Sequence, residues 1–338
     1  MKLFIFTIEP QSGFGTALKG DTLFGHYCWQ ACYDSSLLAD SIENVLGYYD
    51  RRPFAVFSSA VPRLTSESLL FAIKRPDLPP HMLMPTPSKR LEGILAAKDN
   101  KKKKWLPVAR DLCVDCKSKR FLTDAELMEA AWSSGASLAK SPFIDTVRAH
   151  NTINRFTGTT GPAPFAPYET GCLFYAPGFR LAVLVALDPD ITNVELIDKG
   201  LQRIGQTGYG RDASTGCGRF KVNNVEELAM PDWNRTRALY TMGPSVVPRG
   251  FFKRFYCKPF VRFGRHGDRL ANSSNPFKNP VIMADEGAVG IAPAISDGFE
   301  GIIGSAVKEI SKVQPQAVAQ GYTFCLPLEL ATSSIPED

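Results

Sequence analysis

One glycine-rich stretch holds most of the residues that could bind a charged ligand. It runs from Gly205 to Phe220 (GQTGYGRDASTGCGRF) and combines five glycines with two arginines and the hydroxyl side chains of Ser214 and Thr215. Glycine accepts positive φ and lets a ligand approach the backbone, and the planar guanidinium group of arginine suits phosphate oxygens. The stretch predicts an anion-binding loop in which backbone amides and side chains act together. Its predicted contact residues are Gly208, Gly210, Arg211, Ser214, Thr215, Gly216, Gly218, Arg219 and Phe220.

A second concentration of polar side chains lies between Thr146 and Gly161 (TVRAHNTINRFTGTTG). Polar and apolar residues alternate there, which is typical of a β-hairpin that presents hydrogen-bonding groups from one face. Such side chains can contact phosphates and base edges, and Phe156 or Phe220 could stack on a base. The predicted contacts in this hairpin are Arg148, His150, Asn151, Asn154 and Arg155.

The glycine-rich loop follows a predicted helix and precedes a predicted strand. Apolar residues recur every three or four positions over 191–204, and 220–225 has strand composition. In Rossmann and P-loop sites the order is reversed, so that phosphate meets the positive end of a helix. This loop cannot use a helix dipole in that way, so its own amides and arginines must hold the anion.

The elements around the loop predict an α+β fold that begins with a ferredoxin-like unit, β-α-β-β-α-β. A further apolar run at 179–187 has strand length, and about residues 75–142 form a long insertion. The insertion contains a lysine run before Trp105, which could act as a finger against RNA, and a helix at 123–139 with Thr123 and Glu126 spaced as a capping box. The six predicted elements of the unit are Lys2–Glu9, Asp21–Tyr33, Phe54–Ser58, Leu69–Ile73, Val194–Ile204 and Phe220–Val225.

A change of composition near residues 230–237 predicts a domain boundary. We expect an N-terminal domain over 1–230 and a smaller C-terminal domain over 231–338, since 338 residues suffice for two cores. The second domain is expected to contain a helix and three strands, over Gly301–Ser311, Ala238–Met242, Phe251–Phe263 and Tyr322–Leu330.

Charge and cysteine usage indicate the partner and the compartment. The net charge of +5 is concentrated in basic clusters beside aromatic residues or glycines, which favours single-stranded nucleic acid over a membrane, although any single cluster could equally be a solvated face. The N-terminus has a strand pattern and not that of a signal peptide. The eight cysteines lack a disulfide framework, so we expect reduced thiols and a cytoplasmic location.

Tests for catalysis and metal binding leave two candidates. Cys113 and Cys116 have zinc-like spacing, but no second pair completes a tetrahedral set, so we expect no metal and no cofactor, with a structural zinc as the alternative. RNA cleavage needs only a general base and cations, and His26 could supply the base. Its position between Phe24 and Tyr27 of an apolar stripe also suits a packing histidine. The sequence has no GxSxG motif and no acidic residue in a recognisable catalytic context.

Four motifs together resemble one family. They are the helix opening GDTLFGHYCWQA, the hairpin RAHNTINRFTG, the FAPYE that follows it, and the loop GYGRDASTGCGRF. The combination is similar to the RAMP superfamily of CRISPR systems, and in order and spacing to the family of the fourth Csm subunit of type III-A (Csm) effector complexes. The resemblance extends over most of the first 225 residues.

The resemblance implies two ferredoxin-like, RRM-related domains, the first with the glycine-rich loop and a thumb-like insertion within Arg75–Arg120. It implies a non-catalytic subunit that holds the 5′ repeat-derived tag of the guide RNA in a ribonucleoprotein of antiviral defence. The implied partners are crRNA, the large polymerase/cyclase-type subunit and the backbone RAMP subunits, with target RNA reached indirectly and no membrane. A metal-independent endoribonuclease that processes precursor RNA is the alternative from the same superfamily.

Overall fold

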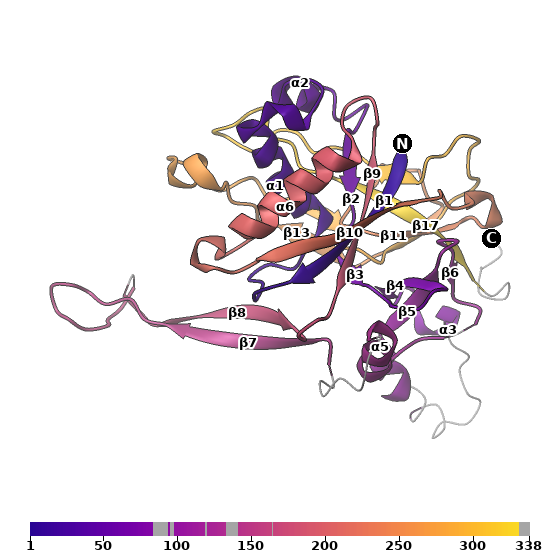
Figure 1. Cartoon of the computed structure of the whole chain (residues 1–338), viewed down its shortest axis with the longest axis horizontal. Coiled ribbons are helices and arrows are strands. Elements are labelled where there is room, and N and C mark those ends of the chain that lie inside the picture. The colour runs from indigo at the N-terminus through magenta and orange to yellow at the C-terminus, as the bar shows by residue number, and fades with distance from the viewer. Residues whose placement is uncertain (84–93, 95–97, 119, 133–140, 164, 331–338) are drawn as a thin grey trace.

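The N-terminal half of the fold is a sheet in the order β10-β1-β9-β2, with every neighbouring pair antiparallel. The computed structural model describes residues 1–83, 94, 98–118, 120–132, 141–163 and 165–330 (Figure 1). Along the chain, α1 connects β1 to β2 and α6 connects β9 to β10, while the short β3 also pairs with β9. The bounds are β1 Lys2–Pro10, α1 Gly20–Tyr33, β2 Ala55–Phe57, β3 Val61–Pro62, β9 Leu181–Leu187, α6 Val194–Thr207 and β10 Phe220–Leu228.

The third strand of this sheet is not the predicted one. Leu69–Ile73 was expected to fill that place, but β9 lies between β1 and β2, and β4 (Leu69–Lys74) pairs with β5 (Trp105–Ala109) outside the sheet. All seven residues of β9 are buried. A central strand that is covered on both faces needs apolar residues at successive positions, and the run at 181–187 meets that need.

The sheet is covered on both faces because the side chains of β1 alternate between two cores. Phe4, Phe6 and Ile8 pack with α1 and α6 in one core, and Leu3 and Ile5 pack in the other against the C-terminal strands. This alternation follows from the two-residue period of a strand. Figure 1 shows α1 and α6 together on the helical side of the sheet.

The C-terminal strands form a second sheet, in the order β12-β15-β11-β17-β16. β6, which lies in the predicted insertion, joins this sheet in parallel to β17. The hairpin of β13 and β14 lies beside it, since Ser245 bridges Ala284 of β14. The bounds are β6 Val114–Asp115, β11 Ala238–Thr241, β12 Arg254–Tyr256, β13 Pro259–Arg262, β14 Val281–Ala284, β15 Val289–Ile291, β16 Ile302–Gly304 and β17 Tyr322–Glu329.

The predicted helix at Gly301–Ser311 is wrong. Residues 302–304 form β16, and Gly301, Gly304 and Glu309 have positive φ, which an α-helix excludes. Within the described residues 231–330 there are strands and 3-10 turns but no α-helix. The expectation of helices on a second ferredoxin-like unit is therefore not met there, while the predicted strands at 238–242 and 322–330 are confirmed as β11 and β17.

A two-stranded arm extends from the body of the molecule (Figure 1). It consists of β7 (Phe143–His150) and β8 (Tyr168–Tyr175), paired in register from Phe143 opposite Tyr175 to His150 opposite Tyr168. This corrects the predicted hairpin at 146–161. Residues 146–150 lie on β7, residues 151–161 lie in the connection at the far end of the arm, and the second strand of the hairpin is β8.

The described parts of the insertion pack against the body instead of projecting as a thumb. β5 pairs with β4, β6 pairs with β17, and α5 (Asp124–Ala131) begins with the predicted capping box of Thr123 and Glu126. Residues 84–93, 95–97, 119 and 133–139 of the predicted thumb and helix lie outside the described residues. Two further short helices are α2 at Ile42–Gly47 and α3 at Pro80–Leu83.

None of the helices in the described ranges has the length and apolar character needed to cross a bilayer. All eight cysteines are free thiols, in keeping with the absence of a disulfide framework in the sequence.

Candidate nucleic-acid interface

The glycine-rich loop leaves the end of α6 in the left-handed conformations that its glycines allow. Gly208, Gly210, Gly216 and Gly218 all have positive φ, as does Asp212. Close packing also excludes side chains: a Cβ on Gly218 would lie 2.1 Å from the carbonyl oxygen of Tyr209. The loop is therefore folded tightly on itself, and its shape depends on glycine.

The amides of these glycines are already engaged by the protein, which corrects the expectation that they hold phosphate. Gly208 N–H donates to the Ile204 carbonyl, Gly210 N–H to Nε2 of His26 and Gly218 N–H to the Gly13 carbonyl. Gly216 N–H donates to the carbonyl of Ala213. The glycines shape the loop, and contact with an anion falls to its side chains.

Four predicted side chains are exposed along the loop, and one is not. Phe220 is only 2% exposed and packs in the core beside α6, so the prediction that it stacks on a base is wrong. The hydroxyl of Thr215 donates to the Asp212 carbonyl. The exposed members, which we call the loop crest, are Arg211, Ser214, Thr215 and Arg219.

The arm meets the loop through residues 12–15, which lie between them. Phe14 pairs with Leu173 of β8 through two backbone hydrogen bonds of 2.8 and 2.9 Å, and Arg219 N–H donates to Oγ of Ser12. A Cβ on Gly13 would lie 2.4 Å from Sγ of Cys172. This contact joins three segments that are far apart in sequence, and single-sequence patterns carry no signal for it.

Arg211 and Arg148 approach the same point from the loop and from the arm. Nη2 of Arg211 donates to the carbonyl of Gly171 at 2.6 Å, and Arg148 lies over the ring of Phe174. Burial raises the pKa of Cys172, the neighbouring thiol of Cys217 raises it further, and both guanidinium groups act in the opposite direction. Two predicted contacts that are 63 residues apart in sequence thus both contact strand β8 of the arm.

Arg148 and His150 lie on the same face of the arm, as their two-residue spacing requires. His150 stacks on Tyr168 with ring centroids 5.1 Å apart and an angle of 11° between the rings. Its Nε2 is 2.9 Å from the hydroxyl of Thr170. This face of the arm therefore presents the guanidinium group of Arg148, the stacked rings of His150 and Tyr168, and the hydroxyl group of Thr170.

The other predicted contacts of this stretch lie beyond the strands, at the far end of the arm. Asn151 and Arg155 are exposed. Asn154 shapes the connection, since its Oδ1 accepts from the Phe156 amide and its backbone pairs with Thr159. Phe156 is fully exposed, so the arm carries a solvent-exposed aromatic ring at its end.

His26 supports the loop instead of facing solvent freely. It is half-buried, its ring lies 5.1 Å from that of Tyr209, and its Nε2 accepts the Gly210 amide at 3.0 Å. An imidazole that accepts at Nε2 must be unprotonated there. Burial, with a smaller contribution from Lys278, lowers the pKa of His26 to about 4.

Acidification should therefore weaken the fold through His26. Below pH 6.5 the unfolded chain binds a proton that the folded chain excludes down to about pH 4. We expect the free energy of unfolding to fall by about 2 kcal/mol between pH 7 and pH 5 from this residue. In His26→Gln, which keeps an acceptor without titrating, urea unfolding should show a correspondingly smaller fall. Equal falls in the two proteins would contradict the assignment.

Trp105 and the cysteine pair have structural environments. Nε1 of Trp105 donates to Oδ1 of Asp124 at 2.7 Å, so Trp105 is not a free finger against RNA. Cys113 and Cys116 are buried beside β6, and burial raises the pKa of each thiol. Across the described ranges, no group of three or more His, Cys, Asp or Glu side chains is arranged to hold a metal ion.

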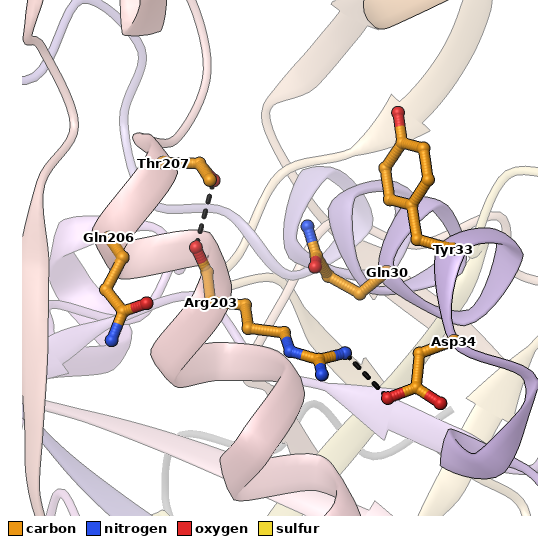
Figure 2. Close-up of a pocket in the computed structure, with 6 residues that line it drawn as sticks. All are labelled: Gln30, Tyr33, Asp34, Arg203, Gln206 and Thr207. Atoms are coloured by element: carbon orange, nitrogen blue, oxygen red, sulfur yellow. Dashed lines mark hydrogen bonds and ion pairs between the residues drawn. The ribbon is translucent and has the colours of Figure 1, made fainter.

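A polar recess between α1 and α6 was not anticipated from the sequence. It has a volume of about 430 Å³ and is lined by Gln30, Tyr33, Asp34, Arg203, Gln206 and Thr207 (Figure 2). Asp34 accepts from both Arg203 and Lys199 at 2.9 Å. These ion pairs tie the end of α1 to α6, from which the glycine-rich loop departs, so the recess helps to position the loop.

No protein-family model and no curated protein matches this sequence, but solved structures do. A chain of a Csm3–Csm4 subcomplex of the type III-A CRISPR-Cas interference complex aligns with a TM-score of 0.58 and 13% identity, covering 97% of this chain and 100% of its own. A chain of a Csm1–Csm4 cassette in complex with pppApA aligns with a TM-score of 0.52 and 15% identity, covering 98% and 100%. A chain of a Csm1–Csm4 cassette in complex with cA4 aligns with a TM-score of 0.51 and 15% identity, covering 97% of this chain and 99% of its own.

These chains are aligned over nearly their whole lengths, and Csm4 is common to the structures that contain them. The chain therefore shares the fold of a chain found in these Csm3–Csm4 and Csm1–Csm4 structures, in agreement with the resemblance of its sequence motifs to Csm subunits.

Proposed function

We propose that this protein is a non-catalytic guide-RNA-binding subunit of a type III-A CRISPR interference complex, where it holds the 5′ repeat-derived tag of crRNA. The observation that carries the proposal is that Arg211 of the loop donates to the Gly171 carbonyl of the arm, on which Arg148 lies over the ring of Phe174. Guanidinium groups so placed can neutralise successive phosphates of a single strand. The Csm-type fold supports the same role.

The mechanism follows from the chemistry of the two surfaces. The loop crest offers Arg211, Arg219 and hydroxyl groups to the sugar-phosphate backbone, and the arm offers a ring stack and polar groups to the bases. Single-stranded RNA has splayed bases and exposed 2′-hydroxyls, so it is recognised by stacking and edge contacts and not by groove reading. An RNA strand that contacts both surfaces must bend where they meet, which would fix the register of the guide.

The architecture suits an assembly role. We infer that the first sheet with α1 and α6 is the ferredoxin-like, RRM-related unit, since its chain order and strand order follow the β-α-β-β-α-β pattern. We infer that the arm of β7 and β8 is the thumb-like element that the resemblance implies. The proposed partners are crRNA, the large polymerase/cyclase-type subunit and the backbone RAMP subunits, in a cytoplasmic ribonucleoprotein of antiviral defence.

The proposal is tested by crosslinking the assembled particle and mapping the peptides that carry RNA. Peptides from the arm and from the loop crest should carry the 5′ end of the guide. Crosslinks confined to other surfaces of this subunit, or no crosslinks to it at all, would remove the proposed role.

A processing endoribonuclease remains the second candidate, and His26 distinguishes it. The imidazole is occupied by the Gly210 amide, so it lacks a free nitrogen lone pair at Nε2 to act as a base. We expect the purified chain, incubated with precursor RNA and chelator at high protein concentration, to produce no sequence-specific cleavage on a denaturing gel. Specific cleavage that disappears in His26→Ala would favour the enzyme instead.

A further inference from the structure

A cavity of about 160 Å³ lies at the root of the arm, where β7 and β8 meet the two sheets. It is smaller than the 300–1,000 Å³ typical of pockets for drug-sized ligands, which suits a single ring system. Five aromatic side chains contribute to its walls, and they come from β5, β7, β8, the segment before β9, and β11. They are Trp105, Phe143, Tyr175, Phe179 and Tyr240.

The same cavity has a polar atom that the described part of the protein leaves unsatisfied. Thr241 lines the cavity, is 0% exposed, and has a hydroxyl with no hydrogen-bond partner among the described residues. A buried unpaired hydroxyl is costly and rare in native proteins, so it calls for a partner from outside the chain. Glu286 also lines the cavity: its Oε2 contacts Lys19 at 2.6 Å and Ser59 at 3.2 Å, and its Oε1 lies 3.9 Å from Nζ of Lys74.

We propose that this cavity binds one unstacked nucleobase of the guide RNA, with its ring against the aromatic walls and its edge toward Thr241 and Glu286. The inference rests on the proposed function and specifies it further. Aromatic walls bind any base through its faces, while a hydroxyl and a carboxylate oxygen can pair with a base edge that carries an amino group.

The cavity lies on the opposite face of the arm from the Arg148 contacts. Phe143, Leu173 and Tyr175 line it, and strand alternation places Arg148 and His150 on the other side. Among the described residues β7 pairs only with β8, so the outer edge of β7 is open to a ligand. A strand bound at the arm and loop would reach the cavity by bending around that edge.

Abasic scanning of the RNA tests the inference. Guide RNA recovered from the purified complex supplies the sequence for a set of single-stranded RNAs, each with one abasic nucleotide. Binding to the full-length protein is measured by fluorescence anisotropy. Loss of one base should weaken binding at least ~fivefold at a single position.

Filling the cavity should abolish the loss of affinity that the abasic nucleotide causes at the sensitive position of the RNA. In Ala60→Leu, which enlarges a cavity-lining side chain, intact RNA should bind no better than RNA lacking the critical base. Thr241→Val, which removes only the hydroxyl, should reduce the effect of the same position without abolishing it. Ala294→Leu, an exposed change outside the cavity, should behave as the unaltered protein does.

The outcomes separate this inference from the proposed function. Tight RNA binding with no sensitive position, or with a sensitive position unaffected by both cavity variants, would overturn the base pocket and leave the RNA-binding role intact. Failure of any RNA to bind would overturn both. Free nucleoside monophosphates form the last comparison. If their binding is lost in Ala60→Leu while RNA binding is unchanged in that variant, the cavity belongs to a free nucleotide instead.

Discussion

Replacing Arg211 and Arg219 together with alanine is expected to lower the affinity for single-stranded guide RNA by ~100-fold at moderate salt. Each guanidinium group can make a charge-assisted hydrogen bond to phosphate, worth about 1.5 kcal/mol or more, and ~3 kcal/mol corresponds to about 100-fold. The dependence of log affinity on log salt should become less steep by about 1.4, which is the expectation for two lost phosphate contacts on a single strand. Anisotropy titrations at several salt concentrations measure both quantities.

A matched double variant controls for the loss of net charge. Arg51→Ala with Arg249→Ala removes two exposed arginines outside the arm and the loop, and it should change affinity and salt dependence little. Purified complexes should also retain less RNA with the Arg211 and Arg219 changes. If RNA content, RNA length and affinity all stay unchanged in that variant, the loop crest has no part in RNA binding.

The second large effect is expected at Gly218, where alanine should lower the free energy of unfolding by about 3 kcal/mol. Its φ of +73° is unfavourable for any residue with a Cβ, and that Cβ would lie 2.1 Å from a backbone oxygen of Tyr209. Left-handed strain costs ~1 kcal/mol or more, and an overpacked contact that backbone must absorb adds ~1–3 kcal/mol. Urea unfolding followed by circular dichroism measures the change.

Gly216 provides the control within the same loop. Its φ is +93°, but a Cβ there would have no atom within 4 Å, so Gly216→Ala should cost only the conformational term of about 1 kcal/mol. Equal destabilisation by the two changes would show that close packing against Tyr209 does not hold the loop. RNA affinity should fall in Gly218→Ala and stay nearly constant in Gly216→Ala.

Much of the first half of the fold follows from local patterns. The periodicity of α6 and its Asn193 cap, the alternation in β1, and the Thr123 capping box all have short-range physical causes, and each is present in the structure. The third strand was mistaken because both 69–73 and 181–187 are apolar and of strand length. Only burial on both faces, which depends on distant elements, distinguishes the central strand from the other.

The site was foreseeable in its residue types but not in its atomic roles. Arginines and hydroxyls on a glycine-rich loop indicate anion contact, and four of them are exposed. Two of the acceptors that occupy the glycine amides are distant in sequence: His26 lies 184 residues from Gly210, and Gly13 lies 205 residues (218 − 13) from Gly218. The burial of Phe220 likewise depends on α6 packing over it, where Gly205 leaves room for the Phe220 backbone. Such long-range contacts leave no local signal.

The place of β17 has a consequence for synthesis of the chain. β17 is the last described strand, yet it lies between β11 and β16 and also receives β6 from the middle of the sequence. Until residues 322–329 leave the ribosome, three earlier strands have no hydrogen-bonding partner along one edge, and the apolar side chains of Leu3 and Ile5 lack part of their cover. Until β17 is synthesised, the nascent chain therefore carries open edges on β6 and β11, the condition in which chaperones protect against aggregation.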